Sequence, residues 1–309
     1  MEKSERTMKT RLSYGSILIA SIGLLAGCSQ LKNDQTPTAP TLSIHGEAFA
    51  SPASANFHGD AIRKQNWDMN ICRSCHGRTY AGGTAQKSCL TCHTQTSGPE
   101  ACNTCHGTFS APATSVVLWA PPRGVNGDSL TTSRAVGAHQ GHLQATFGKA
   151  LKCQECHTVP AQVYAAGHLD SPLPAKVAMN DTLANLISGN GTLVPHPVYD
   201  AAQLQCNNTF CHGNWQVKKA AAPADRQYIY TDSMITGENH SPKWTGGMSE
   251  AACGTCHGLP PKGHLQGLNL TTCGNSGCHA GIVDESGKII DPAKHINGKI
   301  DIQMTERTF

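Results

Sequence analysis

The sequence is poor in aromatic residues and in charge. Only 5% of its 309 residues are Phe, Trp or Tyr and 15% are charged, whereas 31 are glycine and 17 are proline. So few aromatic side chains cannot build an ordinary core for a chain of this length, and we expect another source of buried apolar surface. The formal net charge of +3 provides no broad basic surface, so no nucleic-acid partner is expected. Beyond residue 28 no apolar run approaches membrane-spanning length, so only the N-terminus is expected to touch lipid.

The chain does have cysteine pairs, each followed immediately by a histidine. Five copies have two residues between the cysteines and two copies have four. The pairs are Cys72 and Cys75, Cys89 and Cys92, Cys102 and Cys105, Cys153 and Cys156, Cys206 and Cys211, Cys253 and Cys256, and Cys273 and Cys278, and the histidines are His76, His93, His106, His157, His212, His257 and His279. The shorter form is the attachment signature of c-type haem, in which both thiols bond to the porphyrin and the histidine ligates the iron. Seven motifs predict seven covalently bound haem c groups, with these histidines as proximal iron ligands.

Three other uses of paired cysteines fit less well. A zinc site takes two cysteine pairs and does not explain a histidine after every pair. A thioredoxin-like redox pair needs a βαβ setting that this chain rich in Gly and Pro does not indicate, and a disulfide framework again leaves the histidines unexplained.

Nine histidines lie outside the motifs, enough to give every iron a second, distal imidazole. The expected distal ligands are His58, His139, His142, His168, His240, His264 and His295. His45, in a predicted tether, and His196, between two prolines, are the expected bystanders. Methionine is the competing ligand, although Met69, Met179, Met234, Met248 and Met304 are more typical of packing. Irons with two histidine ligands have no open site for substrate, so electron transfer is expected and no catalytic residue is assigned.

The N-terminus has the pattern of a bacterial lipoprotein. Residues 1–27 hold four basic residues and then an apolar stretch ending in Leu25-Ala26-Gly27, which predicts a signal peptide cleaved before Cys28. Acylation of the Cys28 thiol would attach the protein to a lipid bilayer. Because Ser29 replaces the Asp that tends to retain lipoproteins at the inner membrane, we expect an outer-membrane location, on the periplasmic or cell-surface face.

The rest of the chain divides by motif spacing. Residues 28–57 are rich in Pro, Ser and Thr and are expected to form a flexible tether. Residues 58–115 carry three closely spaced motifs, and residues 116–309 carry four with longer spacers. The expected fold is mostly irregular, with short α-helices, little β-structure, and an organisation around the covalently bound haems.

Several segments resemble the CxxxxCH/CxxCH multihaem c-type cytochromes of metal-reducing bacteria. The resemblance lies in the alternation of long and short motifs and in the runs 120–127, 137–143, 253–261 and 295–301, and it covers residues 100 to 301. The resemblance implies respiratory electron export across or beyond the outer membrane, toward metal oxides, electrodes or partner cells. Other cytochromes and an outer-membrane porin conduit are the expected partners. It also implies distal roles for the matching residues His139, His142, His168, His264 and His295.

Two other functions are compatible with the sequence. One is a multihaem reductase of nitrogen or sulfur oxyanions, which needs one haem with an open coordination site; no Cys-x-x-Cys-Lys variant marks such a site. The other is a subunit of a cytochrome filament. Lipidation at Cys28 argues against this function, because it favours a monomer tethered to the membrane.

Overall fold

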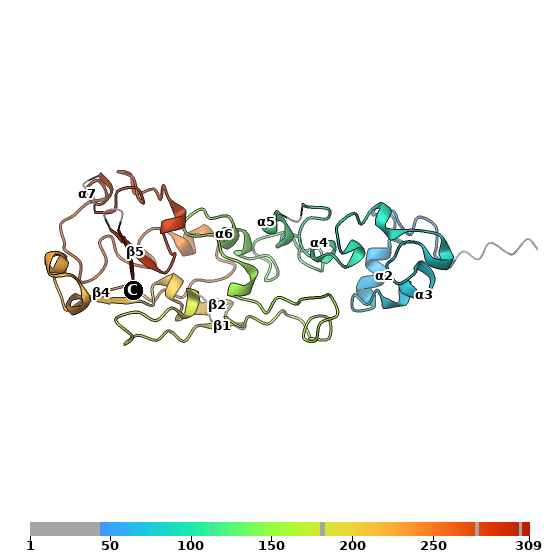
Figure 1. The fold of residues 1–309 in the computed structure, drawn as a ribbon, viewed down its shortest axis with the longest axis horizontal. Coiled ribbons are helices and arrows are strands. Elements are labelled where there is room, and N and C mark those ends of the chain that lie inside the picture. Colours follow the sequence, from blue (N-terminus) through green and yellow to red (C-terminus); the bar gives the residue numbers. More distant parts are fainter. Residues whose placement is uncertain (1–43, 113, 180–182, 276–277, 303–304) are drawn as a thin grey trace, which may run out of the picture. The chain divides into compact units, whose positions relative to one another are not determined.

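The computed structural model describes residues 44–112, 114–179, 183–275, 278–302 and 305–309 (Figure 1). The chain divides into two compact units, residues 1–64 and residues 65–309. The predicted signal peptide 1–27, the lipidation site Cys28 and the first part of the predicted tether lie outside the described residues. The predicted boundaries at 57/58 and 115/116 stay predictions.

Most of the chain is irregular and is interrupted by short helices and two-stranded antiparallel sheets (Figure 1). The α-helices are α2 His58–Lys64, α3 Asn70–His76, α4 Cys102–Cys105, α5 Val116–Trp119, α6 His139–Leu143 and α7 Leu270–Asn275. The 3-10 helices are η1 Gly83–Ala85, η2 Cys89–Thr91, η3 Gly98–Glu100, η4 Cys153–Glu155, η5 Leu183–Asn185, η6 Phe210–His212, η7 Lys219–Ala221, η8 Ala224–Ile229, η9 Met248–Ala251 and η10 Pro292–Lys294. The strands are β1 Val198–Asp200, β2 Gln205–Asn207, β3 Gln216–Lys218, β4 Met234–Thr236, β5 Lys299–Ile302 and β6 Thr305–Thr308. The predicted irregular fold with short helices and little sheet is confirmed at the level of the backbone.

Several cysteine motifs form a single helical turn. The amides of His93, His106 and His157 donate to the carbonyl of the first cysteine of their own motif at 3.0, 3.0 and 2.9 Å. This bond between residues four apart is that of an α-helical turn, and it brings residues three apart onto one face. The two thiols of a short motif are therefore held on one side of the turn, beside the histidine.

The three sheets pair adjacent segments of the chain. Strand β1 pairs with β2, β3 with β4, and β5 with β6. In the first sheet Tyr199 lies opposite Cys206, so the first cysteine of a long motif is held in a strand rather than in a helix. The four residues between Cys206 and Cys211 then carry the chain from β2 into η6.

The apolar core of the described residues is small and scattered. Val136 is 1% exposed, Tyr80 4% and Phe210 4%, and many of the other buried apolar residues are alanines. In contrast, Ile71, next to the first motif, is 56% exposed, and Leu90, inside the second, is 40% exposed. The polypeptide alone therefore buries little large apolar surface. Among the described residues, no helix is long and apolar enough to cross a membrane.

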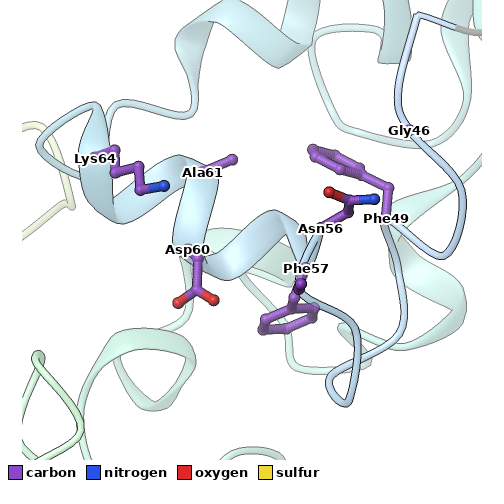
Figure 2. Close-up of a pocket in the computed structure, with 8 residues that line it drawn as sticks. Gly46, Phe49, Asn56, Phe57, Asp60, Ala61 and Lys64 are labelled. Carbon is purple, nitrogen blue, oxygen red and sulfur yellow. The ribbon is translucent and has the colours of Figure 1, made fainter.

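Unit 1 is described from residue 44 and consists of tight turns followed by α2. The ring of His45 stacks on that of Phe49 with ring centres 4.2 Å apart, and the Nδ1 of His58 is 3.0 Å from the Phe49 carbonyl oxygen. Figure 2 shows an open hollow in this unit, between side chains of α2 and of the preceding turns. Its lining residues are Gly46, Phe49, Ala55, Asn56, Phe57, Asp60, Ala61 and Lys64, and none of them is a predicted haem residue.

In unit 2, a partly buried polar network joins the first motif to a segment far along the chain. The Tyr80 hydroxyl donates to Glu100 at 2.7 Å and accepts from Arg73 Nε at 3.0 Å. Arg73 also pairs with Glu100, and its guanidinium lies 5.2 and 5.4 Å from the ring centres of Tyr80 and Tyr164. The Tyr164 hydroxyl accepts from the Met69 amide at 3.1 Å. Burial raises the pKa of Tyr80, and the hydrogen bond to Glu100 raises it further. The Tyr80 hydroxyl therefore stays protonated and can donate.

Candidate haem sites

The cysteines of the seven motifs are all free thiols. Burial raises the pKa of Cys105 to about 11, that of Cys206 to about 11 and that of Cys156 to about 12. These thiols are therefore protonated at neutral pH when no group is bound to them. Within the described residues, no group of three or more His, Cys, Asp or Glu is placed to hold a metal ion. The disulfide and zinc alternatives therefore gain no support from the described structure.

Four motif histidines each lie opposite a histidine from another part of the chain. The ring centres are 6.2 Å apart for His106 and His168, 6.2 Å for His157 and His139, 6.2 Å for His212 and His142, and 6.4 Å for His257 and His295. For a fifth motif histidine, His279, the evidence is electrostatic: burial lowers its pKa, and the charge of His264 lowers it further.

The ring separations fit two imidazoles on opposite sides of one metal ion. A bond from a first-row metal to imidazole nitrogen is about 2.0 Å, and the ring centre lies ~1.1 Å behind that nitrogen, so two trans ligands have ring centres about 6.2 Å apart. The observed separations of 6.2 to 6.4 Å agree with this value. The donor set therefore fits haem iron.

The second ring nitrogen of these histidines also supports ligation. In nine histidines Nδ1 contacts a backbone carbonyl oxygen, and because a carbonyl only accepts, Nδ1 carries the proton and Nε2 keeps its lone pair. The nine are His58, His76, His139, His142, His157, His168, His257, His264 and His295. Burial lowers the pKa of His139 to about 4 and that of His212 to about 3, so both imidazoles are neutral at neutral pH, as a ligand must be.

Helix α6 carries distal candidates for two motifs. His139 and His142 are three residues apart, so they share one face of this short helix. Between them Gln140 donates from Nε2 to the carbonyls of Val117 and Pro121 at 3.0 and 2.9 Å, which fixes α6 against the segment around α5.

Sequence reasoning missed Trp244, whose ring contacts both histidines of α6. Its ring centre is 4.8 Å from that of His139, edge to face, and 5.8 Å from that of His142, nearly parallel. The chain has only four tryptophans. That rarity, together with the position of Trp244 just before the sixth motif, is the signal that could have drawn attention to it.

Two neighbouring motifs also touch each other. The Cys256 sulfur lies 3.9 Å from Nδ1 of His212. Gly213 follows this histidine at φ +95°, and a Cβ there would lie 2.0 Å from the Cys256 carbonyl oxygen. Only glycine permits this approach of the two motifs.

The remaining histidines have other surroundings. His240 donates its amide to the His212 carbonyl at 2.8 Å, and its Nε2 lies 3.6 Å from the Glu250 carboxylate. The ring of His93 meets that of Phe109 edge on, with ring centres 5.2 Å apart.

The seven predicted distal ligands are all partly buried, whereas His45 and His196 are exposed. The competing ligands Met69 and Met179 are buried, Met248 is exposed, and Met304 lies outside the described residues.

A comparison with protein families finds a match to part of the chain. Residues 205–257, which contain the fifth and sixth motifs, match the family described as the Geobacter CxxxxCH...CXXCH motif. No curated protein and no solved structure matches the chain. The matched segment thus carries the long and the short haem-attachment motifs in the order typical of that family, which supports a multihaem c-type cytochrome.

Proposed function

We propose that the protein is a lipid-anchored heptahaem c-type cytochrome that carries electrons in outer-membrane or extracellular respiratory electron transfer. The observation that carries this proposal is the set of motif histidines that face a second histidine at the separation expected for trans ligands of one iron. Haem would supply a one-electron couple at each site, and two histidine ligands favour electron transfer over substrate binding.

The contacts between sites support an order for the haems, numbered here by motif. We place the third and fourth sites next to each other, because the charge of His157 adds to burial and to the charge of His168 in lowering the pKa of His106. The fourth and fifth sites share α6, which holds His139 and His142. These contacts favour a path from the third to the fifth site in chain order.

The path continues through the last three sites. The contact of Cys256 with His212 joins the fifth and sixth sites. The charge of His257 is among the influences that lower the pKa of His279, which supports placing the sixth and seventh sites next to each other. The chain's own role is to hold these ligands, keep them neutral and keep successive sites close enough for electron transfer.

Haem counting and electron paramagnetic resonance (EPR) test this proposal together. The purified protein should contain seven haems by the pyridine haemochrome assay, and its oxidised form should give only low-spin signals. Fewer haems would contradict the heptahaem assignment. One equivalent of high-spin iron would instead favour the oxyanion reductase, because it would reveal an open coordination site.

The membrane anchor needs a separate test. The proposed acyl group on Cys28 would keep the protein in the membrane fraction, on the periplasmic or cell-surface face of the outer membrane. A variant in which residues 1–28 are replaced by a signal peptide that is cleaved without lipidation should appear in the soluble fraction with its haems intact, because no acyl group remains on the mature chain. Equal membrane retention of both proteins would contradict lipid anchoring. A purified soluble form that assembles into filaments would favour the filament alternative.

The proposed partners are other cytochromes, a porin conduit and extracellular electron acceptors such as metal oxides. Mixing the reduced protein with ferric oxide or with an oxidised cytochrome, and following the loss of the ferrous spectrum, would test them.

A further inference from the structure

We propose that Trp244 is a positioning residue shared by the fourth and fifth haem sites, and that it sets the orientation of both distal imidazoles. This inference rests on the proposed function, because it concerns histidines proposed as iron ligands. It assigns a role to a residue that belongs to neither the motifs nor the ligands.

The contact geometry singles out Trp244. The indole meets the His139 ring at an interplanar angle of 85° and the His142 ring at 22°, so one aromatic side chain contacts two neighbouring ligands in different ways. Its Nε1 donates to the Arg134 carbonyl at 2.8 Å, and its amide donates to the Leu204 carbonyl at 2.6 Å. Both ends of the residue are thus tied to backbone.

The segment before α6 is shaped to receive this indole. Gly137 has φ +42°, and a Cβ at this position would lie 2.0 Å from Nε1 of Trp244 and 2.3 Å from its Cε2. A side chain at position 137 and the observed indole cannot occupy the same space. The glycine therefore permits a close contact between the 205–257 segment and the helix that bears two ligands.

The orientation of each ligand ring matters for its iron. An imidazole can turn about its bond to a metal, so its plane is set by the groups that touch it. In His139 and His142, Nδ1 is held by the carbonyls of Val136 and Ala138 at 2.7 and 2.9 Å. Trp244 adds a second restraint, against the ring itself.

The resulting ring planes differ between the two sites. His139 lies 20° from the plane of its motif partner His157, whereas His142 lies 83° from the plane of His212. Nearly parallel and nearly perpendicular imidazoles give different low-spin EPR spectra. They also split the iron d orbitals differently and so shift the reduction potential. Trp244 would therefore tune two successive sites at once.

Variants at Trp244, studied in the haem-loaded full chain, test this role. Trp244→Phe keeps a ring but loses the Nε1 donor, and Trp244→Leu removes the aromatic contact. We expect seven haems in each variant, altered low-spin EPR signals for two of them, and shifted midpoint potentials for the same two in a spectroelectrochemical titration. Gly137→Ala displaces the indole from the opposite side and should alter the same two signals.

Trp119→Phe is the matched control. Its indole donates to the Ala111 carbonyl at 3.4 Å, and among the described residues it makes no ring contact with a predicted ligand. This variant should keep the wild-type EPR signals and potentials. The inference would be overturned by unchanged signals and potentials in both Trp244 variants, by changes spread over all seven haems, or by loss of haem. A wild-type protein without low-spin haem would overturn the proposed function as well.

Discussion

Replacing a distal histidine with methionine tests the ligand pairing one site at a time. His168→Met removes a ring that lies 25° from the plane of its motif partner, and His142→Met removes one that lies 83° from its partner. Each histidine faces one motif histidine, so each variant should change one haem of the proposed seven. Nearly parallel imidazoles give a rhombic low-spin EPR signal, and nearly perpendicular ones give a signal with a large maximal g value.

The two variants should therefore lose different signals. His168→Met should remove one equivalent of rhombic signal, and His142→Met should remove one equivalent of the large-g signal. In both variants one haem should shift to a higher potential, because methionine ligation raises it relative to histidine. Quantified EPR and a redox titration measure these changes, and His196→Met, at an exposed histidine, is the control. Loss of the same type of EPR signal in both variants would refute the pairing. Any change of EPR signal or potential in the control variant would refute it as well.

Three further predictions concern the motifs and the fold. Cys206→Ser and Cys273→Ser should each leave one haem joined by a single thioether, so part of the pyridine haemochrome band should shift to longer wavelength; an unchanged band would show that the first cysteine of a long motif forms no thioether. Gly213→Ala should cost roughly 1–3 kcal/mol more in unfolding free energy than Gly281→Ala. Both glycines have positive φ (+95° and +82°), but only a Cβ at position 213 would collide with backbone atoms. Equal costs in chemical denaturation would contradict this contact. Tyr80→Phe should lower the unfolding free energy by about 1–3 kcal/mol, because it removes hydrogen bonds to two charged partners, Arg73 and Glu100, and a loss below about 0.5 kcal/mol would show that water replaces the hydroxyl.

The sequence predicts the haem motifs because each is local. A pair such as Cys102 and Cys105 with the following His106 closes within one helical turn, and no tertiary information is needed to recognise it. The irregular fold with short helices also follows from composition, since the chain has few aromatics and many glycines and prolines. These features depend on neighbours in the sequence.

The pairing of the proposed ligands could not be predicted in this way. His106 faces His168 and His257 faces His295, and in both cases a long irregular segment without periodicity separates the partners. Nothing in the local sequence of His240 distinguishes its position beside Glu250 from that of a histidine opposite a motif. The contact of Trp244 with α6 also joins distant segments, so it becomes visible only in three dimensions.

The position of α6 in the chain has a consequence for maturation. The proposed distal ligands of the fourth and fifth haems, His139 and His142, precede their motifs, whereas His168 and His295 follow the motifs that they face. A chain exported N-terminus first would deliver α6 before either motif that it serves. The fourth and fifth sites could then acquire both ligands as soon as their motifs emerge, whereas the third and sixth would wait for later residues. The order of residues along the chain would thus set the order in which the sites are completed outside the cytoplasm.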